Sequence, residues 1–436
     1  MTWKRYAVAM MWFNILGLLA VCGLQRAQRI LPLDPQGFAG VGADSSFNTA
    51  VSFASNTNWQ GYSGEAAMSY LTQMVALTVQ NFVSAAAGMA TLVALIRGFR
   101  QRSAALLGNF WVDLVRGTLH ILLPLSLVLA LLLVSQGVVQ NLRPYQSAQL
   151  VEATSDADGK PVTEQVLPMG LAASQIAIKQ LGANGGGFFN VNSAHPFENP
   201  TPLSNFLEVL AILLIPAALC YMFDLMVKDT RQGWALLAAM TLLFVPLLVL
   251  CLSSEQAGNP RLAGLGVDQV ASAGQAGGNM EGKEVRFGIA NSALWAAGLM
   301  VGRMPEYLGK EIEAFEMKMA SLIILIPCAA VLCATALAIA TETGVASLQD
   351  HGPHGFSEIL YAFSSMGNNN GSAFGGLSAN VPFYNLLGGA VMFISRYWLA
   401  IPILAIAGSL AAKEAVPQSA GALPTHTPLF RGSGSA

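Results

Sequence analysis

The sequence predicts an all-α polytopic membrane protein in which a spanning helix, a short pore helix, a loop and a second spanning helix form a repeated unit. Only 11% of the 436 residues are charged and 54% are hydrophobic, whereas soluble domains carry roughly 25% charged residues. Several apolar runs reach about 20 residues, which is the length of a helix that crosses a bilayer. Three clusters rich in Asn and Gly each follow an apolar stretch that is too short to cross.

The first apolar run follows Lys4 and Arg5 and resembles a secretory signal peptide at first sight. It is long for that role, and no clear small-x-small cleavage site follows it, so a first spanning helix is favoured. The spans are predicted at 5–24, 68–96, 116–137, 204–227, 234–254, 318–340 and 383–411.

Positive charge is unevenly distributed between the connecting loops. Short loops carry groups of Arg and Lys, whereas residues 341–382 contain neither. Because positive charge stays on the cytoplasmic side, the basic loops and the N-terminus are expected inside and the long polar loops outside. The basic residues are Arg97, Arg100, Arg102, Arg116, Lys228, Arg231, Arg303, Lys310 and Lys318.

The three Asn/Gly clusters then fall on the outer side. Short apolar stretches at 45–54, 171–181 and 356–366 precede SNTNWQGYSG, LGANGGGFFN and GNNNGSAFG, respectively. A short helix that enters the membrane and returns as irregular backbone must be buried in protein or line water. The pattern therefore predicts three re-entrant helices, each followed by a loop.

Such loops have the composition of an ion filter. A ring of backbone carbonyls replaces the water shell of a potassium ion, which requires left-handed or extended backbone that Gly and Asn tolerate. A phosphate loop is disfavoured because no Gly-Lys-Ser/Thr follows. Packing of small residues between helices is an alternative for any one cluster. Three clusters in the same context favour a filter.

The alternation of spans fails once. Span 234–254 should end outside, yet the loop at 302–318 reads as inside, and only residues 287–301 are apolar between them. A helix of that length rises roughly 22 Å, less than a hydrocarbon core of about 30 Å. Either the bilayer is thinned there or sequence is missing.

Composition also limits the chemistry. The net charge of −2 gives no sign of nucleic-acid binding, and no nucleophile–base pair or metal-ligand cluster is visible, so no catalytic site is expected in this chain. His351 and His354 lack a third ligand and favour a turn, and His195 is expected to fold its loop. The cysteines form no CxxC pair and are expected to be small buried apolar residues: Cys22, Cys220, Cys251, Cys328 and Cys333.

Long blocks of the chain resemble a known family. The blocks SNTNWQGYSGE, LGANGGGFFNVNSAHPFENPT, NMEGKEVRFG, GRMPEYLGKEIE, HGPHGFSEILYAFSSMGNNNGSAFGGLSAN and LPTHTPLF are similar to the potassium-binding, translocating A subunit of the bacterial Kdp potassium-transporting ATPase. HPFENPT and GRMPEYLGK separate this family from other members of the potassium transporter superfamily. The resemblance covers nearly the whole chain.

The resemblance implies four span–pore helix–filter loop–span repeats around one pseudo-fourfold pore. On this chain they are expected at 5–97 (filter 55–60), 116–228 (filter 182–187), 234–303 (incomplete, filter missing) and 318–411 (filter 367–371), followed by a cytoplasmic tail, 412–436. The family normally has a helix before the segment that begins at Met1, a third filter and a last helix after LPTHTPLF. The chain is therefore expected to be shortened at both ends and internally deleted in repeat 3.

The resemblance also implies partners and a location. A P-type ATPase catalytic subunit, a single-span accessory subunit and a small fourth subunit are expected in the bacterial inner membrane. Potassium would be the only metal, and no nucleotide would bind this chain. The implied potassium-filter residues are Asn56, Thr57, Asn58, Gln60, Asn184, Gly185, Gly186, Asn369, Asn370 and Gly371.

Arg396 lies in the middle of the last span, where a charge is costly and usually faces a cavity or partner. In the family reading it would lie below the filter, repel cations and regulate entry to a tunnel. Glu306 and Lys310 are expected to be solvated or to touch a partner subunit.

The sequence favours a subunit that binds external potassium and delivers it to the ATPase. The alternatives are a self-sufficient potassium channel or ion-coupled transporter of the same superfamily, a broken-helix transporter for organic solutes, and a non-functional fragment.

Overall fold

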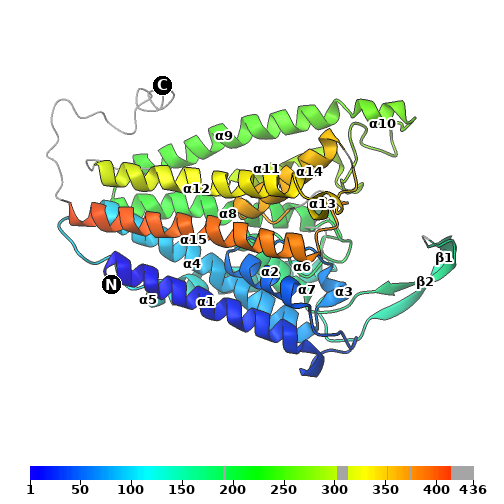
Figure 1. Cartoon of the computed structure of the whole chain (residues 1–436), viewed down its shortest axis with the longest axis horizontal. Coiled ribbons are helices and arrows are strands. Elements are labelled where there is room, and N and C mark those ends of the chain that lie inside the picture. Colours follow the sequence, from blue (N-terminus) through cyan, green and yellow to red (C-terminus); the bar gives the residue numbers. More distant parts are fainter. Residues whose placement is uncertain (157, 190–192, 302–312, 351, 373–375, 414–436) are drawn as a thin grey trace.

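The computed structural model describes residues 1–436 except 157, 190–192, 302–312, 351, 373–375 and 414–436. Long helices lie side by side along the longest axis of the molecule (Figure 1). Among the described residues, seven helical stretches are long and apolar enough to cross a membrane, and they match the seven predicted spans. They are α1 (Trp3–Ala27) with η1 (Gln28–Ile30), η2 (Thr72–Thr78) with α4 (Val79–Arg100), α5 (Phe110–Arg116) with η3 (Gly117–Leu122) and α6 (Leu123–Ser135), α8 (Pro202–Val227), α9 (Thr230–Gln256) with α10 (Pro260–Gly264), α12 (Ala314–Ile339) and α15 (Pro382–Ala412).

Capping residues explain where several spans begin. The third span starts six residues before the predicted position because Asn109 Oδ1 accepts a hydrogen bond from Trp111 N at 3.0 Å. Asp229 caps α9 in the same way, through Arg231 N at 3.1 Å. Each cap satisfies a backbone N–H that the first helical turn leaves without an intrahelical partner.

Three short helices sit among the spans at the predicted places. They are α2 (Ala43–Ala54), α7 (Ala172–Leu181) and α14 (Pro353–Gly367), and most of their residues are buried. All three lie in the half of the molecule opposite the N-terminus (Figure 1). Short helices α3 (Gly64–Ala67) and α13 (Glu342–Val345) lie in the same half.

The last span forms the centre of the packing. α15 contacts α1, α2, α4, α12 and α14. Small residues allow α15 to come close to α4, since a Cβ on Gly98 would lie 2.7 Å from Ala407 Cα. In a bilayer, where lipid is as apolar as side chains, such close packing is a main source of helix association.

The two ends of the bundle differ. At one end the segment after α4 contacts both termini of the described chain: Leu107 N donates to Met1 O at 2.9 Å and Ala104 N donates to Ala411 O at 2.8 Å. The loop with Arg100 and Arg102 therefore lies with the N-terminus. The short helices α2, α7 and α14 lie toward the other end, in agreement with the predicted sidedness.

That other end carries a β-hairpin that the all-α prediction did not include. Strands β1 (Gln146–Ser155) and β2 (Pro161–Leu167) pair antiparallel and project from the bundle (Figure 1). Asp156 Oδ1 accepts from Lys160 N at 2.8 Å and fixes the turn. Most side chains of both strands are exposed, so the sequence has no alternating hydrophobic pattern that would predict them.

α11 (Gly288–Val301) occupies the place where the alternation of spans failed. Its 14 residues correspond to about 21 Å of helix. It packs on α8 and α9 and is shorter than any of the seven candidate spans.

The expectation that the cysteines are buried is wrong for four of them. Cys220 is buried, but Cys22 and Cys251 are half-buried and Cys328 and Cys333 are exposed. Hydropathy places a cysteine in a span but does not tell which face of the span meets lipid. Glu306, Lys310, Arg303, His351 and the tail 414–436 lie outside the described residues.

Candidate ion-filter site

The loops that follow the three short helices meet one another. We call residues 55–60 filter loop 1, residues 182–187 filter loop 2 and residues 367–371 filter loop 4. A Cβ on Gly185 would lie 2.6 Å from Asn370 O, 2.8 Å from Thr57 O and 3.3 Å from Gly371 Cα. Three segments far apart in the sequence thus meet at one point, with Gly185 and Gly371 next to each other.

Glycine is required at this meeting point for two reasons. Gly185 has φ +110° and Gly371 has φ +88°, conformations that side chains disfavour. A Cβ on Gly371 would also collide with Thr57 O. Backbone can approach backbone here only because both positions lack a side chain.

Left-handed residues occur in or beside every filter loop. Asn56 (φ 64°), Asn58 (φ 54°) and Asn369 (φ 53°) bear out the expectation that Asn supplies this geometry. Ala183 (φ 46°) is an unexpected member because alanine gains nothing from this conformation. The turn that ends α7 holds it, since Ala183 N donates to Gln180 O at 3.1 Å.

Hydrogen bonds tie filter loops 1 and 2 together. Asn58 and Gly186 exchange two of them: Asn58 Nδ2 donates to Gly186 O at 3.1 Å, and Gly186 N donates to Asn58 O at 3.2 Å. Two more involve Asn56, whose Nδ2 donates to Gly182 O at 3.2 Å and whose Oδ1 accepts from Asn184 Nδ2 at 2.5 Å.

Filter loop 4 is fixed both to loop 1 and to itself. Asn369 Nδ2 donates to Thr57 Oγ1 at 2.6 Å. Asn370 Oδ1 accepts from Ser372 N at 3.0 Å and so closes its own loop. The Asn side chains of all three loops therefore bind protein, and backbone carbonyls such as Thr57 O and Asn370 O face the meeting point.

Gln60 ends filter loop 1 and lies against filter loop 2. A Cβ on Gly186 would lie 2.5 Å from Gln60 Oε1, so the amide of Gln60 rests against filter loop 2. The structure thus places all ten predicted filter residues in or beside one cluster.

Helix α4 supplies two supports that the sequence analysis missed. Asn81 Oδ1 accepts from Asn58 Nδ2 at 2.6 Å, and Ser84 Oγ donates to Asn56 Oδ1 at 2.8 Å. Both side chains are fully buried. Their spacing of three residues puts them on one helix face, and that polar pair inside an apolar span is the signal that would have found them.

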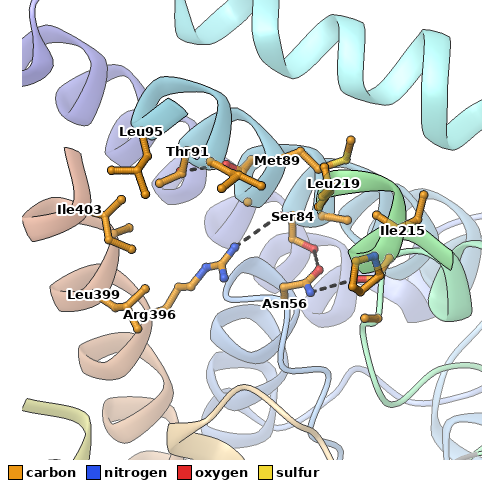
Figure 2. A pocket seen from close by; sticks show the side chains of 18 of the residues that line it. Asn56, Ser84, Met89, Thr91, Leu95, Ile215, Leu219, Arg396, Leu399 and Ile403 are labelled. Carbon is orange, nitrogen blue, oxygen red and sulfur yellow. Dashed lines mark hydrogen bonds between the residues drawn. The ribbon is translucent and has the colours of Figure 1, made fainter. Parts of the chain in front are cut away.

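A cavity of about 420 Å³ lies beside filter loops 1 and 2 and is lined by residues of α1, α4, η3, α7, α8, α9, α12 and α15. Figure 2 shows Arg396 reaching across it toward Ser84 and Asn56. Arg396 Nη2 donates to Ser84 O at 3.5 Å. Among the lining residues that the structure describes, Arg396 is the only one with a formal charge, and the rest are mostly apolar.

The loop that leaves filter loop 2 is organised by His195. Its ring stacks on Phe189 with centroids 4.0 Å apart, and its Nδ1 accepts from Phe197 N at 3.1 Å. Burial, with a smaller contribution from Arg286, lowers the pKa of His195 to about 4. The ring is therefore neutral near pH 7, and its expected role in folding the loop is confirmed. Within the described residues no group of three His, Cys, Asp or Glu side chains could hold a metal ion.

Comparison with known proteins identifies the family. The model of the KdpA family, described as "Potassium-transporting ATPase A subunit", matches residues 1–297 and 296–434. This chain belongs to the KdpA family. The two matched stretches meet at 296–297, inside α11.

Curated members of the KdpA family are similar over almost the entire chain. The potassium-transporting ATPase potassium-binding subunit of Sorangium cellulosum is 60% identical, and the alignment covers 99% of this chain and 84% of the relative. The subunits of the same name from Herpetosiphon aurantiacus and Methylococcus capsulatus are each 58% identical with the same coverage. The Sorangium alignment runs over 489 positions, more than the 436 residues of this chain.

Proposed function

We propose that this chain is the potassium-binding, channel-like subunit of an ATP-driven potassium importer. The observation that carries the proposal is the convergence of Thr57 O, Asn370 O and Gly185 from three separate loops. Carbonyl dipoles aimed at one point replace the hydration shell of a monovalent cation. Family membership and the printed names of the relatives support potassium as that cation.

In this proposal the ten filter residues have two kinds of task. Thr57, Gly185, Gly186, Asn370 and Gly371 present main-chain oxygens or make room for them. Asn56, Asn58, Asn184 and Asn369 hold the loops through their amides, and Gln60 supports loop 2 from outside.

The proposed importer needs partners. A P-type ATPase catalytic subunit would bind and hydrolyse ATP, and a single-span and a small fourth subunit would complete the complex in the bacterial inner membrane. We place potassium binding in this chain and nucleotide binding in the ATPase subunit. Arg396, the charged group of the cavity, would keep cations from resting below the filter.

We also propose that the third repeat lacks its filter. Three observations support this: the family match is in two stretches that meet at 296–297, the alignment is longer than the chain, and α11 has only 14 residues. Four repeats in chain order around one axis would put repeats 2 and 4 on opposite sides. Here Gly185 of repeat 2 and Gly371 of repeat 4 are in contact. This contact favours a second candidate function, a subunit that binds potassium without conducting it.

Cation binding is tested by the apparent melting temperature of the purified chain in KCl or NaCl at equal ionic strength. A ligand that binds only the folded state stabilises it by about 2.7 kcal/mol at 100 times its dissociation constant. We expect KCl to raise the melting temperature more than NaCl does. Equal melting temperatures in the two salts would refute potassium binding.

Transport is tested in liposomes with radioactive rubidium as the tracer. Uptake that needs both ATP and the ATPase subunit supports the importer, whereas uptake by the chain alone identifies a self-sufficient channel. Uptake of amino acids instead of rubidium identifies a solute transporter. Potassium-dependent stabilisation with uptake equal to that of empty liposomes identifies a non-conducting binding subunit.

A further inference from the structure

Behind filter loop 2 lie three ionisable side chains with no exposure to solvent: Lys179, Glu198 and Glu208. None belongs to the predicted filter. Burying charges costs several kcal/mol for each ion unless partners compensate. Because this cost is high, a role for these side chains next to a filter loop is to be expected.

Lys179 and Glu198 form an ion pair across the filter segment. Lys179 lies in the last turn of α7, just before filter loop 2, and Glu198 lies in the segment that leads from that loop to α8. The pair therefore joins the chain entering the loop to the chain leaving it.

The stem of Lys179 also supports the loop directly. A Cβ on Gly187 would lie 2.7 Å from Lys179 Cδ, so the side chain passes beneath the last glycine of the loop. The carbonyl of Lys179 accepts from Asn184 N at 2.9 Å. Lys179 thus contacts the loop twice, at Asn184 through its backbone carbonyl and at Gly187 through its side chain.

A second set of contacts joins the same pieces of chain to α8. Gln180 Nε2 donates to Glu208 Oε2 at 2.6 Å and to Ser193 Oγ at 2.6 Å. Ser193 Oγ in turn donates to Glu198 Oε1 at 3.3 Å. The ion pair is one member of a continuous buried network that links α7, the exit segment and α8.

We propose that the Lys179–Glu198 ion pair is a clamp that sets the position of filter loop 2 and thereby the discrimination between potassium and sodium. The inference rests on the proposed function of the loops. Lys179 and Glu198 are positioning residues, since they pair with each other and the Lys179 stem lies against Gly187, whereas the atoms nearest Gly185 belong to Asn370, Thr57 and Gly371. Two apolar side chains would fill the same space with similar stability. The ion pair adds a fixed direction and length between the two ends of the loop.

The decisive variant is the double substitution K179M/E198M. It removes the two charges of the pair together. Glu208, the buried carboxyl that remains, keeps its hydrogen bond from Gln180 Nε2 at 2.6 Å, so the chain is expected to fold. The apparent potassium affinity is expected to fall on the order of tenfold, as expected from the loss of one strong contact, and the difference between the KCl and NaCl melting temperatures is expected to shrink. The single variant E198Q, which keeps the amide as a hydrogen-bond acceptor for Lys179, is expected to lie between wild type and the double variant.

The matched control is K160M. Lys160 pairs with Asp158 at 3.5 Å on the hairpin, and both side chains are about three-quarters exposed. The K160M variant should show the same melting temperatures in KCl and in NaCl as the wild type.

The outcomes separate the two proposals. A folded double variant with the wild-type response to KCl and NaCl overturns the clamp and leaves potassium binding in place. A wild-type chain with no preference for KCl overturns both. If the double variant does not fold, E198Q decides: an unchanged potassium affinity overturns the clamp, and a weakened one supports it.

Discussion

At the scale of residues, the candidate filter depends on backbone conformations that side chains resist. Gly185, Gly371 and three asparagines adopt positive φ in three loops that are far apart in the sequence and meet in the structure. The sequence predicted these positions because Gly and Asn are the residues that tolerate this geometry. It did not predict the left-handed backbone of Ala183, since alanine does not favour this conformation. The turn after α7 imposes it on Ala183.

Replacing Gly185 with Ala is expected to destabilise the filter. The new Cβ would meet Asn370 O at 2.6 Å in a backbone conformation that L-residues avoid, at a cost of about 1–3 kcal/mol. Chemical denaturation measures this cost, and the KCl response should disappear. The control is Gly264→Ala at the end of α10, where a Cβ would meet no atom within 4 Å. Equal effects of the two changes would contradict the proposed crowding.

His195 gives a pH dependence whose sign is fixed by its lowered pKa. Its ordinary pKa is 6.5 and burial lowers it to about 4 in the folded chain. Between these values the unfolded state binds a proton that the folded state does not, so stability falls as the pH falls from 6.5 to 4. His195→Gln should show a smaller loss of melting temperature over this window. A loss identical to that of wild type would assign the pH dependence to other groups.

At the scale of elements, the filter loops depend on α4 as much as on the pore helices that precede them. Asn81 and Ser84 hold loop 1 from behind, and Asn184 of loop 2 bonds to the Asn56 that Ser84 fixes. The short helices α2, α7 and α14 were predictable from local sequence. The sequence shows the polar pair of α4 inside an apolar span, but its bonds to loop 1 become visible only when the loop is placed against the helix.

Replacing Asn81 with Leu is expected to loosen loop 1. Asn58 Nδ2 would lose its 2.6 Å contact to Asn81 Oδ1, at a cost of about 1–3 kcal/mol for a buried polar group. Both the melting temperature and its KCl dependence should decrease. Ser126→Ala is the control, since Ser126 Oγ bonds only within its own helix, to Leu122 O at 2.7 Å. A lower melting temperature with an unchanged dependence on KCl would contradict the proposal that Asn81 supports the filter loops.

At the scale of the whole molecule, hydropathy predicted all seven spans because crossing a bilayer is a local property of some 20 residues. The outward-projecting hairpin escaped prediction because a solvated strand pair has no apolar face to reveal it. Four of the five cysteines were wrongly expected to be buried for a related reason, since hydropathy does not distinguish lipid from protein as the neighbour of a span. The cavity is lined by residues of all seven spans, so no single span predicts it.

Arg396 connects this cavity to the filter. In the chain assembled with the proposed ATPase subunit, Arg396→Ala should change the apparent potassium affinity or the coupling of transport to ATP hydrolysis. The charge faces a mostly apolar space where electrostatic effects are strong. Arg396→Lys keeps the charge and should preserve more of the wild-type behaviour. Uptake kinetics that match wild type in both variants would contradict a role in the pathway.

The bond between Asn369 and Thr57 spans 312 residues of sequence, and this separation has a consequence for biosynthesis. A ribosome adds about 5–20 residues each second, so the first loop to emerge waits on the order of tens of seconds for its last partner. During that interval α1, α2 and α4 are already made while Thr57 Oγ1 lacks the amide that later binds it. The earliest part of the filter to be translated is therefore among the last to be completed.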